Sequence, residues 1–302
     1  MPTESSAVQG ALKFADLVRQ RTNGAVNVQV FADSVLGNDN DLLDQLRNGV
    51  IQMDLTGAPV LSALRGWEPI GAISTPFLFK ADGEEAQYPI FVKLMRGPIG
   101  KDITENGRRV SGVRALDASW WYGLRQTTTK TKQITRPDDV KGLKIRVTDN
   151  PIHKMSMVAL GAAATPMAFA EVYTGLQMGV VEGQQNPLNA IYTMKFYEVQ
   201  KYLTLLGDTT MTMTLNINDK FFQGLSPELR DVLEKCAIEA GEYESQLQLQ
   251  ANKKNLEDLQ AKGMIVNTVN RAEFAERTKD AWKTMESQFG KGLYERVFEA
   301  VR

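Results

Sequence analysis

One helical pattern in this chain is longer than a single domain. Ser226-Pro227-Glu228 is a typical helix start, with serine as the N-cap and proline in the first turn. The helical pattern continues to Lys262, and Gly263 ends it. At 1.5 Å per residue the helix would be about 50 Å long. We therefore expect two domains that are braced by this helix, which Gly241 can kink.

The composition is that of an ordinary soluble globular protein. The chain has 302 residues, 43% of them hydrophobic and 24% charged, which is enough for two domains with separate cores. The 35 basic residues nearly balance the 36 acidic ones, for a net charge of −1. This balance argues against a nucleic-acid partner or an anionic membrane surface. No apolar run reaches the roughly 18 residues that a membrane helix needs.

Cysteine and histidine are too scarce for several kinds of chemistry. Cys236 and His153 are the single members of their types. A lone cysteine cannot form an internal disulfide, and zinc sites usually need several such ligands. Serine or cysteine catalysis with a histidine base would have to use His153. We interpret both residues as structural and expect no cofactor and no metal.

Strand and helix patterns alternate in the first part of the chain, which favours a largely parallel sheet with helices on both faces. We predict helices at 6–22, 39–48 and 84–107, the last interrupted near Gly97-Pro98, and strands at 26–30, 51–56, 109–116, 143–147, 202–207, 211–217 and 264–267.

The stretch from Lys141 to Pro187 carries the most informative pattern. Arg146 sits in the apolar run 143–147, which is typical of a strand. Further on, Phe169, Val172, Leu176 and Val180 have mostly helical spacing, so this part should pack one face on a core. We expect Gly179 to end the helix and a strand to begin at 180–181 and run to Asn186-Pro187.

This stretch resembles the substrate-binding subunits of tripartite ATP-independent periplasmic (TRAP) transporters. The matching patterns are G-L-K-[IL]-R-V around Arg146, P-x-x-F-x-E-V-Y-x-x-L-Q-x-x-x-V-[DE]-G-Q-x-N-P up to Pro187, and P-F-L-F at 76–79. The resemblance extends from Ala11 to the C-terminal helices. It implies an α/β two-domain fold of the periplasmic-binding-protein type (type II-like), with a ligand cleft between the domains. We place the first domain at 1–118 plus 209–245 and the second at 119–208 plus 246–302, with crossovers near 119–134 and 211–217.

The resemblance assigns two arginines to the ligand. In the family, the arginine at the position of Arg146 grips the substrate carboxylate, and the one at the position of Arg125 lies near it. A guanidinium suits this role because its planar donor fork meets a carboxylate bidentately and stays charged at working pH. Two arginines around one buried point need an anion between them, so binding and cleft closure should be coupled.

Further ligand contacts are implied at Asn186 and Phe169. The family's asparagine at the position of Asn186 reaches the ligand, and its amide can either donate or accept. The family also places a pocket residue at the position of Phe169. The chain departs from the family pattern nearby, because Gln185 stands where relatives usually have glutamate and Glu182 stands where they often have aspartate.

Three other residues complete the candidate site. Asp39 corresponds to a polar contact in some sugar-acid binders, and Trp67 is an aromatic candidate. Asp208 stands where many relatives have histidine; facing the cleft, its charge would disfavour a second ligand carboxylate. Indole faces pack on sugar C–H surfaces, so the tryptophan-rich stretch with Trp120 and Trp121 also tilts the expectation towards a hydroxylated monocarboxylate.

We therefore expect a periplasmic receptor, a monomer without enzymatic activity, that delivers a small organic anion to membrane permease subunits. C4-dicarboxylates and 2-oxo or hydroxy acids remain alternatives to a sugar acid as ligand. A carboxylate-processing enzyme on the same fold is a second hypothesis, since two-domain clefts host many enzymes. A receptor that presents its ligand to a sensor is a third.

The first residues, Met1-Pro2-Thr3-Glu4-Ser5-Ser6, lack the basic and apolar regions of a signal peptide. Family members normally begin with an exported leader and a strand before this point. We interpret Met1-Pro2 as the loop that follows that strand, so a truncated start is expected here.

Overall fold

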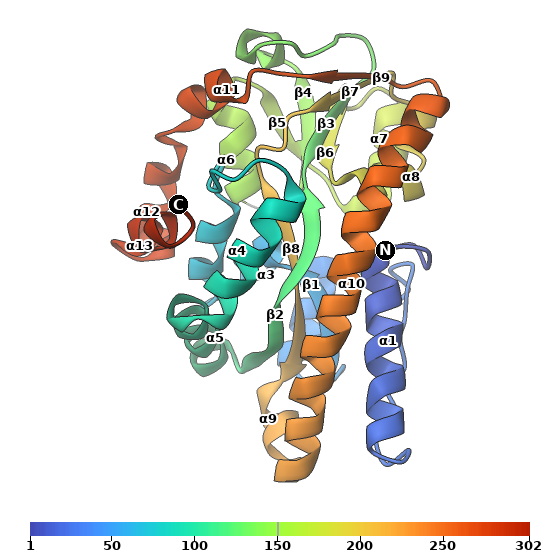
Figure 1. Ribbon diagram of the computed structural model, residues 1–302, viewed down its shortest axis with the longest axis vertical. Helices are drawn as coiled ribbons and strands as arrows, with labels where there is room; N and C mark the ends of the chain where they lie inside the picture. Colours follow the sequence, from blue (N-terminus) through green and yellow to red (C-terminus); the bar gives the residue numbers. More distant parts are fainter. Residues whose placement is uncertain (150) are drawn as a thin grey trace.

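The computed structural model describes residues 1–149 and 151–302, which form two α/β lobes stacked along the long axis of the molecule (Figure 1). The first lobe contains a three-stranded sheet of order β1-β8-β2, and the second a six-stranded sheet of order β5-β4-β6-β3-β7-β9. This arrangement confirms the predicted two-domain α/β fold. The strands are β1 (Met53–Gly57), β2 (Val113–Leu124), β3 (Gln126–Thr129), β4 (Lys144–Val147), β5 (Ala163–Pro166), β6 (Gly183–Asn186), β7 (Tyr202–Leu205), β8 (Thr210–Asn218) and β9 (Ile265–Thr268).

The helices cover the sheets. In chain order up to β8 they are α1 (Ser6–Arg21), α2 (Asp39–Arg47), α3 (Ala58–Leu61), η1 (Glu68–Ser74), α4 (Glu84–Arg96), α5 (Pro98–Ser111), η2 (Pro137–Val140), α6 (Pro151–Ala159), η3 (Phe169–Glu171), α7 (Val172–Gln177), α8 (Leu188–Thr193) and η4 (Phe196–Glu198). After β8 follow α9 (Asp219–Gln223), α10 (Pro227–Ala261), α11 (Arg271–Thr278), η5 (Ala281–Met285), α12 (Glu286–Phe289) and α13 (Leu293–Ala300).

The long helix α10 braces both lobes, as its length predicts. It has 35 residues, and the Ser226 side chain caps it by accepting from the Leu229 backbone N–H at 3.3 Å. It packs on α1 and β2 in the first lobe and on α8 in the second, and it runs beside both lobes in Figure 1. Gly241 does not interrupt it. A Cβ there would lie 2.3 Å from the Trp120 indole, so glycine lets α10 approach β2 closely.

The sheet of the first lobe differs from the expected parallel one, because both of its strand pairs are antiparallel. β8 returns from the second lobe and inserts between β1 and β2, running opposite to both. Residues 26–30, expected to form a strand, are in no described ladder, although Val26 and Val28 pack against the core. The strand expected from 180 begins at Gly183, and Val180 is exposed.

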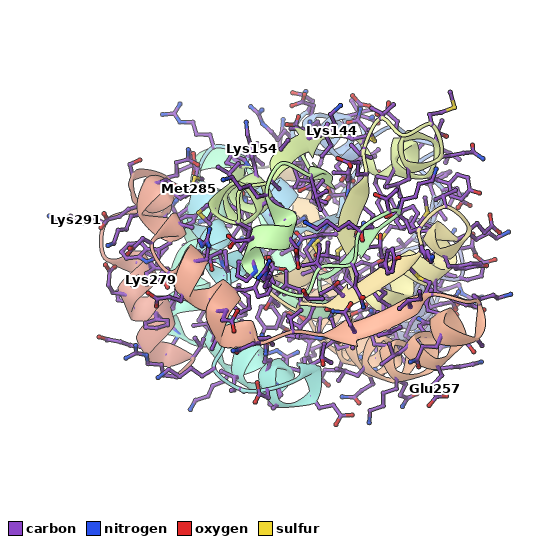
Figure 2. All side chains as sticks on the ribbon, turned by 90° about the horizontal axis from the view of Figure 1, so that it is seen from above. Lys144, Lys154, Glu257, Lys279, Met285 and Lys291 are labelled. Atoms are coloured by element: carbon purple, nitrogen blue, oxygen red, sulfur yellow. The ribbon has the colours of Figure 1, made fainter. Side chains whose placement is uncertain are left out.

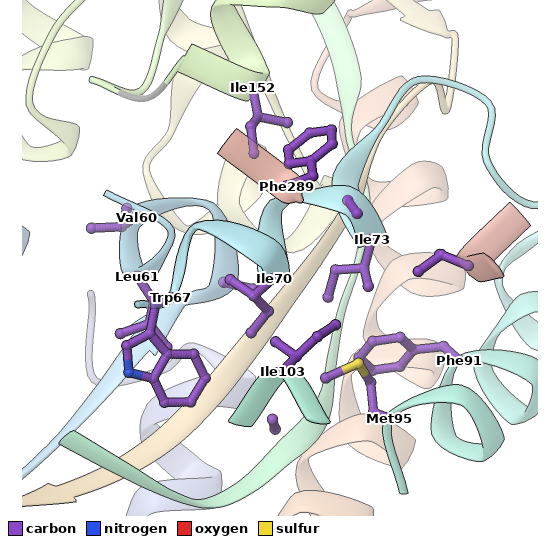
Figure 3. Close-up of a cluster of buried hydrophobic side chains, with 14 of the residues drawn as sticks. Val60, Leu61, Trp67, Ile70, Ile73, Phe91, Met95, Ile103, Ile152 and Phe289 are labelled. Carbon is purple, nitrogen blue, oxygen red and sulfur yellow. The ribbon is translucent and has the colours of Figure 1, made fainter. Parts of the chain in front are cut away.

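The chain crosses between the lobes at Leu124–Gln126, and returns between Leu205 and Thr210. The expected boundary at 118/119 therefore falls inside β2, which continues to Leu124 with several bulges. The C-terminal segment also differs from the expected division. Phe289 of α12 belongs to the hydrophobic core of the first lobe, where it lies beside Ile152 of α6 (Figure 3).

Charged side chains cover the outside of the molecule. Lys144, Lys154, Glu257, Lys279 and Lys291 are exposed and project from different elements (Figure 2). Among the described residues, no helix is both long and apolar enough to cross a bilayer.

Candidate functional site

A cavity of about 220 Å³ lies where the two lobes meet, on the inner side of the crossover. Sites between domains are common positions for small-molecule binding. The wall includes Asp39, Asp54, Gly57, Val60, Tyr122 and Met211 from the first lobe, and Arg125, Thr148, Phe169 and Asn186 from the crossover and second lobe. Residues of the segment 28–36, among them Val28, Val30 and Phe31, also line the cavity.

Arg146 is buried just behind this wall, in the middle of β4. Its Nε and Nη2 donate to the Met167 carbonyl at 3.0 and 2.7 Å. Nη1 is buried and has no hydrogen-bond partner among the described residues. The guanidinium lies 6.0 Å from the ring of Phe169, which does line the cavity. Burial and, to a smaller extent, the neighbouring charge of Arg125 together lower the pKa of Arg146 to about 9.

Arg125 forms part of the cavity wall, directly after β2. Its backbone N–H donates to the Thr209 carbonyl at 2.9 Å, which joins the two crossover segments. Nη2 donates to the Gln185 carbonyl, Nη1 lies 3.6 Å from the Met211 sulfur, and Nε is buried with no partner in the part of the chain described. Burial lowers the pKa of Arg125 to about 10, even though the charge of Asp208 opposes this shift. The two arginines thus present unused donors in one buried region.

Asp208 is a buried counter-charge to Arg125 and does not line the cavity. It is 2% exposed, and its carboxylate accepts from Ser156 Oγ, Gln185 Nε2 (2.9 Å) and Thr209 Oγ1 (3.0 Å). We expected this carboxylate to face the ligand cleft. In the structure its three hydrogen-bond donors hold it inside the second lobe instead. It acts on the site through the charge of Arg125.

Asn186 and Phe169 both line the cavity. Asn186 ends β6, where it is paired with Gln126 of β3, and its Nδ2 donates to Gln184 Oε1 at 2.6 Å. Phe169 begins η3 and packs against the cores of both lobes. The sequence-predicted residues Arg125, Asn186, Phe169 and Asp39 therefore come together around one cavity, with Arg146 immediately behind.

Two carboxylates face the cavity from the first lobe. Asp39 is the first residue of α2, and desolvation raises its pKa more than the Met1 amino group and Arg146 lower it. Asp54 lies on β1, where it accepts from Asn216 Nδ2 and Thr56 Oγ1, both at 2.8 Å. Burial raises the pKa of Asp54 to about 6. Donors on one side of the cavity thus face acceptors on the other.

Trp67 does not reach the cavity, contrary to the expectation of a ligand contact. It is fully buried in the first-lobe core beside Leu61 and Ile70 (Figure 3), and a Cβ on Gly107 would lie 2.2 Å from its indole. Trp120 and Trp121 are also fully buried. These tryptophans therefore pack in the hydrophobic cores, and they do not support the prediction of a sugar ligand.

The sequence prediction missed Asp54, Thr148, Tyr122 and Met211. Asp54 interrupts the apolar pattern of a buried strand, and this was an available signal. Tyr122 follows the two tryptophans and is the aromatic of that stretch on the cavity wall; burial raises the pKa of its hydroxyl. Thr148 and Met211 carry no pattern that separates them from ordinary strand-end residues.

Comparisons with known proteins show a family match along most of the chain. The chain matches the family described as bacterial extracellular solute-binding protein, family 7, over residues 1–288. It is 33% identical over 268 residues to the 2,3-diketo-L-gulonate-binding periplasmic protein YiaO of Escherichia coli, covering 88% of this chain and 78% of that protein. It is 31% identical to the C4-dicarboxylate-binding periplasmic protein DctP of Rhodobacter capsulatus, covering 96% and 83%.

A solved structure is similar over the whole chain. The sugar acid binding protein DctPAm of Advenella mimigardefordensis, in complex with galactonate, superposes with a TM-score of 0.91 at 28% identity, covering 100% of this chain and 95% of that one. The likeness confirms the two-domain fold.

Proposed function

This chain belongs to the family 7 bacterial extracellular solute-binding proteins, the TRAP receptors. We propose that it binds a sugar acid between its lobes in the periplasm and delivers the acid to permease subunits in the membrane. One observation carries the proposal. Two buried guanidiniums, Arg125 and Arg146, each have an N–H group without a partner among the residues that the structure describes, beside a cavity that both lobes line. A buried donor without an acceptor costs free energy, and a ligand carboxylate removes that cost.

The charges around the site favour one carboxylate over two. Asp208 lies beside Arg125 and offsets its charge, and the charge of Asp39 partly opposes that of Arg146. On the opposite side, Asp39 and Asp54 repel a second carboxylate and accept hydrogen bonds from hydroxyl groups. A monoanion with several hydroxyls matches this distribution better than a dianion does.

The relatives support the same class of ligand. The DctPAm structure contains galactonate, and the YiaO protein is described as binding 2,3-diketo-L-gulonate. The DctP protein is described as binding C4-dicarboxylates, which makes these acids the competing ligands to test.

The ligand is expected to leave the protein unchanged. The wall of the cavity offers cations, carboxylates and an amide, and the proposed mechanism is closure of the two lobes around the acid. A closed state is favoured because the ligand contacts both lobes only there. The competing hypothesis is an enzyme that converts a carboxylate. Turnover of the bound acid, followed by NMR, would refute the receptor mechanism.

A thermal-shift screen against several hundred organic acids tests the proposal. A ligand present at a thousand times its Kd stabilises the folded state by roughly 4 kcal/mol. We expect at least one aldonate or uronate to raise the melting temperature by several degrees. A larger shift with a C4-dicarboxylate than with any sugar acid would contradict the proposed ligand class.

A further inference from the structure

His153 is a buried polar side chain beside the two arginines. It lies in the first turn of α6 and is 1% exposed. Its Nδ1 is 2.7 Å from Thr148 Oγ1, a distance at which the two share a hydrogen bond. Its Nε2 is buried and has no hydrogen-bond partner in the described part of the chain.

The position of this pair relates it to the ligand. Thr148 lines the cavity, and it follows β4, the strand that carries Arg146, by one residue. Through its contact with Thr148, His153 adjoins a residue of the cavity wall, and it lies a few residues after Arg146, the main candidate for carboxylate binding. Arg146 Nη1, Arg125 Nε and His153 Nε2 are three buried nitrogens that the described protein atoms leave unpaired.

The imidazole is neutral in this environment. Burial lowers the pKa of His153 well below its usual value, and the charges of Arg125 and Arg146 lower it further. A neutral imidazole has one nitrogen that donates and one that accepts. Which of the two nitrogens carries the proton decides whether Nε2 donates a hydrogen bond to a ligand group or accepts one from it.

Electrostatics favours the proton on Nδ1. The two guanidiniums create a positive potential at Nε2, the unpartnered nitrogen. This potential stabilises a lone pair on Nε2 and destabilises an N–H group there, whose hydrogen carries a partial positive charge. Nδ1–H then donates to Thr148 Oγ1, and Nε2 is an acceptor.

We propose that His153 is a specificity-determining residue whose Nε2 accepts a hydrogen bond from the hydroxyl on the carbon next to the ligand carboxylate. The inference rests on the proposed sugar-acid function. An ionised carboxylate has no proton to donate, so the nearest donor on a bound sugar acid is its 2-hydroxyl. A 2-deoxy or 2-oxo acid lacks this donor and leaves the buried acceptor unpaired.

The test uses D-galactonate together with its 2-deoxy and 2-oxo analogues, measured by isothermal titration calorimetry. The wild-type protein is expected to bind D-galactonate roughly 10- to 100-fold more tightly than either analogue, since sites built for a hydroxyl reject ligands without it. In His153→Phe the preference should fall below about threefold, while the affinity for the 2-deoxy analogue changes little. His153→Gln keeps an acceptor oxygen and should retain part of the preference.

Thermal melts of the ligand-free variants separate folding from binding. A folded His153→Phe or His153→Gln protein that keeps the full wild-type preference overturns the role of His153 and leaves the proposed function intact. An equal loss of affinity for all three acids in the folded variants also overturns it, because it indicates a purely structural histidine. Failure of the wild type to bind any of the three acids or other sugar acids overturns the proposed function, and this inference with it.

Discussion

Replacing Arg146 by glutamine should abolish ligand binding and, at the same time, leave the empty protein as stable as the wild type or more so. Glutamine is neutral and keeps an N–H group for the Met167 carbonyl, which the arginine now occupies with two donors. The substitution therefore removes the buried charge while keeping a local hydrogen bond. Arg146→Lys is the matched control, since it keeps the charge and loses the planar fork.

The magnitudes follow from the burial of the guanidinium. Removing one partner of a buried charge pair costs about 3–5 kcal/mol, or between roughly one hundred- and several-thousand-fold in Kd. In the empty protein the sign is opposite. Burial lowers the pKa of Arg146 from 12.5 to about 9, which disfavours the charged form by on the order of 5 kcal/mol. Opening of the lobes in the empty protein lets water reach the guanidinium and reduces this cost.

The pH dependence has a definite sign. Below about pH 9 the arginine is charged in both the folded and unfolded states, so the full cost of burying the charge is present at every working pH. The cost declines only as the pH rises from about 9 towards 12.5. We therefore expect ligand-free Arg146→Gln to be about 1–2 kcal/mol more stable than the wild type at pH 7.

Urea denaturation and calorimetric titration measure the two effects separately. Arg146→Gln should show no measurable binding, and Arg146→Lys should bind roughly 10- to 100-fold more weakly than the wild type. Near-wild-type affinity in Arg146→Lys would refute the bidentate role. A large loss of stability in ligand-free Arg146→Gln would refute the argument that burial of this charge destabilises the empty protein.

Three further predictions follow from the buried groups. Asp208→Asn removes the charge that offsets Arg125, so calorimetry should show the affinity for succinate rising about tenfold relative to that for a sugar acid; an unchanged ratio would contradict the charge argument. Trp67→Ala should cost roughly 3–5 kcal/mol of unfolding free energy in urea without changing the Kd of the folded protein, whereas a weaker Kd would restore Trp67 as a ligand contact. Burial raises the pKa of Glu244 from 4.5 to about 8, so the folded state keeps this proton longer and stability falls as the pH rises through that interval. Glu244→Gln should remove this decline, so the difference in unfolding free energy between the variant and the wild type should be roughly 1–3 kcal/mol more favourable to the variant at pH 9 than at pH 5. The same pH dependence of stability in the two proteins would contradict this prediction.

Local chemistry made the helices predictable. The cap at Ser226 and the break at Gly97-Pro98 depend on neighbouring residues alone, and both occur in the structure. The antiparallel order of β1, β8 and β2 was not predictable in this way. It depends on β8 pairing with strands that lie far away in sequence, and no local pattern records such a pairing.

The motifs predicted residues that the structure brings together around one cavity, whereas two predicted residues, Trp67 and Asp208, are buried away from it. A tryptophan supplies a large apolar surface to a core or to a ligand, and the spacing around Trp67 does not distinguish the two. Asp208 was placed near the site, but its three hydrogen-bond donors come from separate segments and hold it inside the lobe. Gln185 and Asp208 both depart from the family pattern, and the structure shows them in contact at 2.9 Å.

The most direct test is a calorimetric titration of the wild-type protein with matched panels of aldonates, uronates and C4-dicarboxylates at pH 7 and 25 °C. We predict that a sugar acid binds most tightly, at least tenfold more tightly than any dicarboxylate, because Asp39 and Asp54 line the cavity while the charge of Asp208 offsets that of Arg125. Tightest binding of succinate, malate or fumarate would contradict the proposed ligand class and the charge distribution from which it is inferred.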